Sequence, residues 1–175
     1  GAVSIYSLRS GTRQSVVAGN LNVARRAAEQ IQLYIDTNVK ILQTLASDLE
    51  GTSLQPWQQD RILKNHVLDF PEYREITLFD ATGTPVASSR IGRPQLRPDA
   101  SGTPVGANVT LSPVAVDNDL LPTAVVSIRL TRLNQATGWL QGELRLEELW
   151  RMVDRIRVGQ RGFIARHLRA QPRDV

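Results

Sequence analysis

The sequence predicts an α+β fold in which a long N-terminal helix packs on a five-stranded antiparallel sheet. Three observations lead to this prediction. A helical pattern extends to residue 50, a tight turn at residues 81–83 separates two short strand patterns, and three more strand patterns follow residue 107. Because consecutive strands joined by short turns pair with each other, we expect a single sheet with helices on one side.

The long helix is predicted from about Thr12 to Glu50, a stretch that contains no proline and is followed by Gly51 as a C-cap. Apolar residues recur along it at alternating spacings of three and four, which is a heptad pattern. At ~1.5 Å per residue the helix is about 57 Å long and exceeds the diameter of a domain of this size. The heptad stripe consists of Val17, Leu21, Ala24, Ala28, Ile31, Ile35, Asn38, Leu42, Leu45 and Leu49.

A second, weaker apolar stripe on the same helix includes Val23, Ala27 and Tyr34. Two apolar faces indicate two roles, namely packing on the chain's own sheet and pairing with a second copy in a parallel homodimer. Asn38 has two interpretations: a polar residue that sets the register of the dimer, or one at the edge of the stripe. The residues predicted at the dimer contact are Ile31, Ile35, Asn38, Leu42 and Leu45.

The remaining elements follow in chain order. A short helix begins near Pro56 and ends before Pro71, since proline favours the first helical turn and ends a preceding helix. The first hairpin turns at Gly83, which can adopt a positive φ, and Asp80 can bond the turn backbone. Strands are predicted at 74–80, 84–89, 108–116, 123–131 and 137–146, with a loop at 91–107 and a helix from residue 147. We expect the chain to divide into a long N-terminal helix at 1–51, a lobe built on the sheet at 52–146, and a connecting helix with the segment that follows it at 147–175.

Composition restricts the function classes. The 175 residues include no cysteine, which excludes disulfides, thiolate metal sites and a cysteine nucleophile. The net charge of +4 raises the possibility of nucleic-acid binding, but the basic residues near the C-terminus are mixed with acids, which favours a solvated mixed-charge surface. No stretch approaches 18 consecutive apolar residues, as a membrane span requires, and the N-terminus lacks the pattern of a signal peptide.

Four segments in this order resemble the Cache family of extracellular sensor domains, whose lobes are PAS-like. Residues 76–89 (ITLFDATGTPVASS) resemble the first hairpin of the family, and residues 125–130 (VVSIRL) its fourth strand. Residues 138–150 (GWLQGELRLEELW) resemble the fifth strand and connecting helix, and residues 156–162 (IRVGQRG) the exit from that helix.

The resemblance implies the extracytoplasmic, periplasmic part of an inner-membrane receptor, most simply a sensor histidine kinase, with a chemoreceptor or cyclic-di-GMP enzyme as other outputs. It also implies a small-molecule ligand in the membrane-distal lobe and signalling by displacement of the helices. The chain departs from the double-Cache pattern after Gly162, where Phe163–His167 follow at once, so we expect the second lobe to be absent or incomplete.

Candidate ligand-binding residues lie on the strands and in the long loop. Glu143 stands at the position that matches the acid of the family's pocket, where a carboxylate could pair with a ligand amine. Arginine side chains could instead hold a carboxylate or phosphate, and serines could supply neutral hydrogen bonds. The candidates are Arg93, Arg97, Arg129, Ser88 and Ser127, in addition to Glu143. The loop has no Trp or Tyr beside its arginines, a departure from amino-acid-binding members of the family.

The sequence contains no Ser-His-Asp set, paired-histidine metal spacing or phosphate-binding glycine motif. We therefore expect neither enzymatic activity nor a cofactor or metal, and no nucleic-acid partner. Two functions remain. The first is a sensor that binds a small molecule, and the alternative is a ligand-independent dimerisation or periplasmic protein-interaction module.

Overall fold

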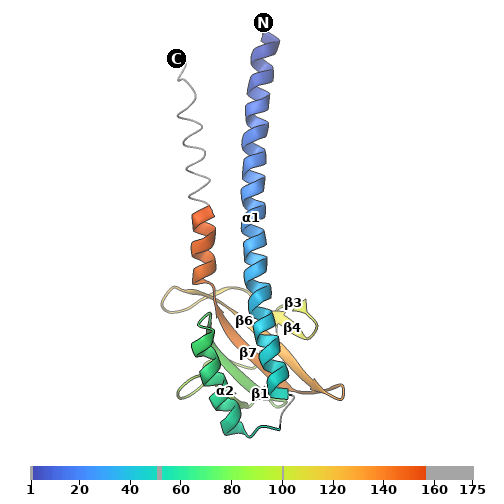
Figure 1. Ribbon diagram of the computed structural model, residues 1–175, viewed down its shortest axis with the longest axis vertical. Coiled ribbons are helices and arrows are strands. Elements are labelled where there is room, and N and C mark those ends of the chain that lie inside the picture. The colour runs from blue at the N-terminus through green and yellow to red at the C-terminus, as the bar shows by residue number, and fades with distance from the viewer. Residues whose placement is uncertain (1, 51–52, 100, 157–175) are drawn as a thin grey trace. The chain divides into compact units, whose positions relative to one another are not determined.

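The computed structural model describes residues 2–50, 53–99 and 101–156. The chain forms two compact units, one made of residues 1–34 and 148–175, and the other of residues 35–147. The second unit contains the end of helix α1 (Ala2–Glu50), helix α2 (Pro56–Asp69) and all the strands (Figure 1). The predicted α+β fold, with a long N-terminal helix and an antiparallel sheet, is confirmed.

Helix α1 begins at Ala2, earlier than the predicted start near Thr12. No proline interrupts this part of the chain, and a single glycine such as Gly11 weakens a helix without ending it. In the first unit, Leu21 and Leu33 are exposed. Ile31 is half-buried there, and Ile35, at the start of the second unit, is half-buried as well.

The last part of α1 packs on the chain's own sheet. The Tyr73 hydroxyl of strand β1 (Tyr73–Asp80) donates a 2.5 Å hydrogen bond to the carbonyl oxygen of Asn38, which ties the helix to the sheet. Asn38, Leu42 and Leu45 have exposed fractions of 3%, 0% and 4% within the single chain. These three residues, which the sequence assigned to the contact between two copies, are thus already covered within the single chain.

The sheet has seven strands in the order β2-β1-β7-β6-β4-β3, with the short β5 also paired to β6, and every pairing is antiparallel. The predicted strand at 108–116 is two strands, β4 and β5, because Pro113 lies between them and lacks the amide hydrogen that a ladder requires. The strands are β1 (Tyr73–Asp80), β2 (Pro85–Ser88), β3 (Thr103–Gly106), β4 (Val109–Leu111), β5 (Ala115–Val116), β6 (Pro122–Arg132) and β7 (Gln135–Arg145).

Strand β3 lies inside the segment that was predicted to be a loop. It pairs with β4 through a tight turn in which Asn108 has a φ of 61°. Asparagine tolerates this left-handed conformation because its short side chain can bond the local backbone. All four residues of β3 are exposed, which is why this strand lacks the apolar alternation that identifies half-buried strands in a sequence.

The two faces of the sheet have different roles. Gly142 of β7 lies on the face covered by α1, where a Cβ atom would approach the Tyr73 ring to 2.6 Å and Leu42 to 3.3 Å. Neighbouring residues in a strand point to opposite faces, so Gln141 and Glu143 lie on the other face. A bulge between Tyr73 and Glu75 changes the register of β1 against β7 at this level.

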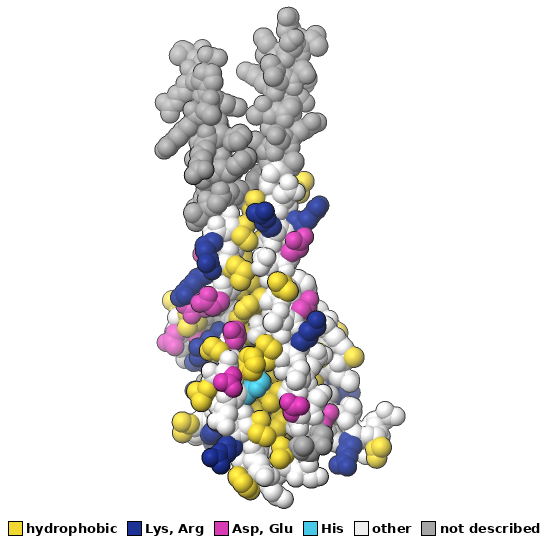
Figure 2. Space-filling view, viewed as in Figure 1, with side chains coloured by type: hydrophobic (Ala, Val, Ile, Leu, Met, Phe, Trp, Pro, Cys, Tyr) yellow, Lys and Arg dark blue, Asp and Glu magenta, His cyan; other side chains and the backbone are white. Residues whose placement is uncertain are grey.

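Residues 147–156 are helical, and from residue 148 on they belong to the first unit, with Leu149 buried and Trp150 exposed. The expected remnant of a second lobe falls on residues 157–175, which lie outside the described residues. Within the described ranges, no helix is both long enough and apolar enough to cross a bilayer. Acidic and basic side chains are interspersed over the face shown in Figure 2, in keeping with the mixed-charge surface that the sequence indicates.

Candidate functional site

Four buried polar side chains form a row across the sheet on the face opposite α1. The strand registers place Ser88 of β2 beside Thr77 of β1, Thr77 beside Gln141 of β7, and Gln141 beside Ser127 of β6. Each of the four is at most 4% exposed. Burial of polar groups is costly unless they are hydrogen-bonded, so a row of this length indicates a built polar surface.

The segment that follows β2 covers this polar row. The carbonyl oxygen of Asp99 accepts a 2.8 Å hydrogen bond from Nε2 of Gln141 and a 3.3 Å bond from the Ser127 hydroxyl. The Ser88 hydroxyl accepts a bond from the backbone N–H of Arg90 and makes a 2.9 Å bond with the Thr77 hydroxyl. The row is thus a floor, and residues 90–99 form a roof directly above it.

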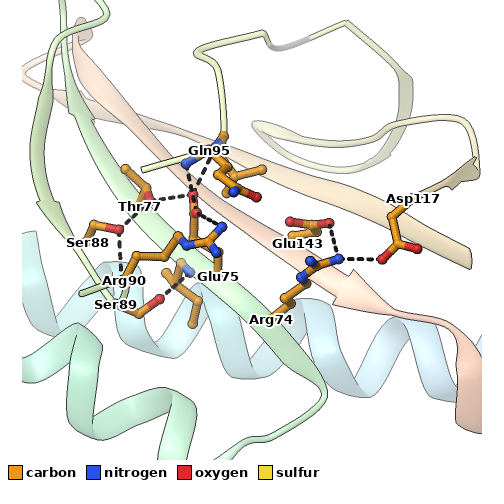
Figure 3. A network of polar contacts seen from close by, with 11 residues as sticks. Arg74, Glu75, Thr77, Ser88, Ser89, Arg90, Gln95, Asp117 and Glu143 are labelled. Carbon is orange, nitrogen blue, oxygen red and sulfur yellow. Dashed lines mark hydrogen bonds and ion pairs between the residues drawn. The ribbon is translucent and has the colours of Figure 1, made fainter. Parts of the chain in front are cut away.

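Glu75, also on this face, is fully buried and receives donors from both floor and roof (Figure 3). Its carboxylate accepts the backbone N–H groups of Gln95 at 2.9 Å and Leu96 at 3.0 Å, and the Thr77 hydroxyl at 2.9 Å. Nη1 of Arg90 lies 3.6 Å from Oε1 of Glu75, which is an ion pair beyond hydrogen-bond distance. A buried carboxylate is stable only with such compensation.

A second set of charged side chains, Arg74, Asp117 and Glu143, lies beside Glu75 and Arg90 (Figure 3). Arg74 contacts the carboxylate of Asp117 and stands 4.0 Å from Oε1 of Glu143. The pKa of Asp117 is lowered, first by the backbone N–H of Leu121, against the opposing effect of burial, and further by Arg74. One guanidinium between two carboxylates leaves a net negative charge, and Glu143 is the member held at the longer distance.

Two buried polar atoms on this face have no hydrogen-bond partner among the described residues. They are Oε1 of Gln141, an acceptor, and Nη1 of Arg90, a donor. Native structures leave few such atoms unpaired, so each one indicates a place for water or a ligand. The face therefore offers an acceptor without a hydrogen bond, a donor held only by its 3.6 Å ion pair with Glu75, and the partly neutralised carboxylate of Glu143.

Helix α2 supports the floor at the edge of the sheet. Asp60 Oδ1 accepts the backbone N–H of Ser88 at 3.0 Å, and Lys64 Nζ donates to the Ser88 carbonyl oxygen at 2.9 Å. The two side chains thus occupy the place of a neighbouring strand on the free edge of β2. Burial acts to raise the pKa of Asp60, but the bonds from Lys64 and Ser88 outweigh it and the pKa is lowered.

The structure places the six predicted ligand-binding residues differently. Ser88 and Ser127 belong to the buried row, and Glu143 lies beside it. Arg129 alternates with Ser127 along β6 and so lies on the same face of the sheet, but its side chain is exposed. Arg93 and Arg97 lie in the roof with exposed side chains. The arginines whose ion pairs lie at the site are Arg74 and Arg90.

Sequence reasoning missed Arg74, Glu75 and Arg90. Glu75 alternates with Thr77 in β1, which places both side chains on one face, and this spacing is the signal that could have indicated a buried acid. The bulge in β1 that brings Arg74 beside Glu143 has no sequence signature here. Arg90 comes two residues after the end of β2, and only the path of the roof turns it back toward Glu75.

A separate cavity of about 720 Å³ lies in the second unit between the end of α1 and the β6–β7 hairpin. Its lining includes Leu49, Phe79 and Arg132, and none of the predicted ligand-binding residues. Among the described residues no group of three or more His, Cys, Asp or Glu side chains is placed to hold a metal ion. The polar face is therefore the stronger candidate for the functional site.

No protein-family profile matches the chain, and no curated protein matches it in sequence. Solved structures match it in fold. The ligand-binding domain of the Pseudomonas fluorescens chemoreceptor CtaA, in complex with L-isoleucine, has a TM-score of 0.61 at 17% identity, covering 81% of this chain and 61% of that one. The ligand-binding domain of the Pseudomonas aeruginosa amino-acid chemoreceptor PctC, in complex with GABA, has a TM-score of 0.55 at 18% identity, covering 70% and 57%.

The sensory domain of the Campylobacter jejuni chemoreceptor Tlp3, with isoleucine bound, has a TM-score of 0.57 at 16% identity, covering 75% of this chain and 60% of that one. The chain spans about three fifths of the length of these solved domains. Identities this low establish the fold alone. The chain has the Cache-type, PAS-like fold found in the ligand-binding domains of bacterial chemoreceptors.

Proposed function

We propose that the chain is the extracytoplasmic sensor domain of a bacterial transmembrane receptor, most simply a histidine kinase, and that it binds a small molecule on the polar row beneath residues 90–99. The observation that carries this proposal is the pair of buried atoms on that face that have no hydrogen-bond partner among the described residues, Oε1 of Gln141 and Nη1 of Arg90. A ligand with one donor and one acceptor group would satisfy both. The domain's role is binding, without catalysis.

The charge beside the row favours a ligand that carries an amine. Glu143 is 15% exposed at its side chain, and its ion pair with Arg74 is long at 4.0 Å. Because Asp117 already neutralises Arg74, the Glu143 carboxylate retains charge for a ligand ammonium. The matched domains were solved with L-isoleucine, GABA or isoleucine, which all bear an amine and a carboxylate. In this chain Arg90, rather than a loop tryptophan or tyrosine, would receive the carboxylate.

Strand β7 offers a path from such a ligand to helix α1. Gln141 and Glu143 face the proposed ligand, while Gly142 between them faces Leu42 of α1. A Cβ atom at Gly142 would lie 2.6 Å from the Tyr73 ring, whose hydroxyl bonds the Asn38 carbonyl oxygen of α1, and 3.3 Å from Leu42 of α1. A small shift of β7 would therefore reach the helix through these two side chains. We propose that ligand binding displaces α1 in this way, and that Ile31 and Ile35 contribute to a parallel homodimer of the membrane-anchored receptor.

A ligand-independent dimerisation or periplasmic interaction module is the second candidate, and one observation favours it. The roof bonds directly to the floor, since the Asp99 carbonyl oxygen accepts hydrogen bonds from Gln141 and Ser127. If the roof never opens, the row is a structural contact and other surfaces carry the function. Ligand binding distinguishes the two candidates.

The test is a thermal-shift screen of the purified domain against amino acids, amines, carboxylates and polyols, followed by calorimetry on each hit. A ligand at about 100 times its dissociation constant stabilises the fold by about 2.7 kcal/mol. We expect Glu143→Gln to abolish the response to amines and Arg90→Gln to abolish the response to carboxylates. The matched controls Glu29→Gln and Arg93→Gln change exposed side chains and should keep both responses. If no compound of the panel binds, the ligand-independent dimerisation or interaction module becomes the favoured function.

A further inference from the structure

The buried carboxylate of Glu75 shares Arg90 with the ligand contacts proposed above but has no contact of its own with the ligand there. It lies in the floor of the site, yet two of its four polar partners are backbone N–H groups of the roof, from Gln95 and Leu96. These partners are 20 and 21 residues away in sequence. Asp80, Asp99 and Asp117, by contrast, accept backbone N–H groups within four residues of themselves, as turn residues do.

The partners of Glu75 together have the chemistry of a carboxylate-binding cradle. Two successive backbone N–H groups form an anion-binding concavity, the arrangement that proteins use to capture free carboxylates. Here the Thr77 hydroxyl and the guanidinium of Arg90 complete the cradle, at 2.9 Å and 3.6 Å from the carboxylate. Figure 3 shows the cradle closed around Glu75.

We propose that Glu75 is an internal carboxylate ligand that latches residues 90–99 over the polar row, so that these residues form a lid. The inference rests on the proposed function, because it assigns the lid to the ligand site described above. When the lid lifts, the N–H groups of Gln95 and Leu96 leave Glu75, and the row with Gln141 becomes accessible. The cradle is then a site for any small carboxylate, which Glu75 normally fills.

The direct test uses Glu75→Ala, which empties the cradle and leaves its donors in place. Hydrogen exchange followed by mass spectrometry should show amide exchange in residues 90–99 at least tenfold faster than in the unaltered domain, with β6 and β7 unchanged. Added formate or acetate should slow that exchange again, while chloride at the same ionic strength should not. Unchanged lid exchange in the variant, or no effect of the carboxylates, would overturn the latch.

Because Glu75 is fully buried, Glu75→Ala can also fail to fold, and a milder variant then decides the question. Arg90→Gln removes the cation of the cradle, whose side chain is 29% exposed, and keeps Glu75. Exchange in the lid should rise in Arg90→Gln and stay unchanged in the matched controls Arg93→Gln and Arg97→Gln, whose side chains are exposed. Equal exchange in all three variants would refute the latch.

The ligand screen separates failure of the latch from failure of the proposed function. If the lid opens in these variants and Glu75→Ala responds to formate and acetate, but the unaltered domain binds no compound of the panel, the latch stands and the sensor proposal fails. If a compound binds the unaltered domain at Glu143 while the lid exchanges equally with and without Glu75, the sensor proposal stands and the latch fails. Faster association of a ligand with Glu75→Ala than with the unaltered domain supports both the latch and the sensor proposal.

Discussion

Glu75 of β1 lies directly opposite Glu143 of β7 in the antiparallel ladder, so two carboxylates share one pair of positions on the same sheet. Like charges at such positions repel each other. Each acid here has its own arginine, with Arg90 beside Glu75 and Arg74 beside Glu143. The surroundings then divide their roles, because Glu75 is enclosed by the lid whereas Glu143 keeps part of its charge.

The two acids should therefore respond differently to neutralisation. Glu75→Gln replaces an acceptor of three hydrogen bonds by an amide whose NH₂ group faces donors, and should lower the free energy of unfolding by about 1–3 kcal/mol. Glu143→Gln removes only a long ion pair and a like-charge neighbour, so stability should change little or rise. Denaturant unfolding of both variants checks this, and equal losses would contradict the division of roles.

The hydrogen bonds of Asp60 and Lys64 with the Ser88 backbone, at the edge of the sheet, provide a second prediction. Lys64→Met keeps the apolar stem but removes the donor to the Ser88 carbonyl oxygen, and should destabilise the domain by about 1 kcal/mol, since the ammonium is partly exposed. Lys40, the other lysine of the chain, is exposed, and Lys40→Met is the matched control. Urea unfolding measures both. A loss in the control as large as in Lys64→Met would show that charge alone is responsible.

The close approach of the Tyr73 ring to β7 makes Gly142 intolerant of a side chain. In Gly142→Ala the new Cβ would meet the buried Tyr73 ring at 2.6 Å, and overpacking of this kind costs about 1–3 kcal/mol. Gly106→Ala places its Cβ no closer than 3.7 Å to its neighbours and should be tolerated. Thermal unfolding of the two variants compares them. Similar melting temperatures would refute the close approach of Tyr73 to Gly142.

Some leucines of helix α1 are buried against the sheet, and others are exposed to solvent. Leu42 is fully buried on the sheet, so Leu42→Ala should cost about 2–5 kcal/mol at any protein concentration. Leu33 is 60% exposed, and Leu33→Ala should leave the unfolding of the single chain nearly unchanged. Denaturation at low and high protein concentration checks both. A cost at Leu42 that depends on concentration would restore this residue to a contact between two copies.

His66 of α2 should make stability depend on pH. Burial lowers its pKa from the ordinary 6.5, although Asp69 and Asp48 oppose the shift. The unfolded chain then binds more protons than the folded one between the lowered pKa and 6.5, so stability is full above pH 6.5 and falls as the pH falls through that window. Unfolding curves from pH 7.5 to 5 should show this decline, and His66→Gln should flatten it.

Much of the fold could be predicted because its signals are local. The proline-free heptad pattern predicted α1, Pro56 and Pro71 bracketed α2, and Gly83 identified the first hairpin. Strand β3 was missed because an exposed edge strand lacks apolar alternation. The break between β4 and β5 was also missed, although Pro113 lies there and cannot donate to a ladder. The two stripes on α1 were visible in the sequence, but their partners were not, and Leu42 proved to face the sheet.

The sequence by itself determined the α+β class, the order of most elements and the placement of Ser88, Ser127 and Glu143 on strands, since period and turn chemistry are properties of neighbouring residues. Only the tertiary structure decided which charges meet. The bulge at residue 74, the register of β1 against β7 and the return of residues 90–99 over the sheet bring Glu75 to Arg90, and Arg74 to Glu143. These pairings depend on long-range packing, which no local pattern encodes.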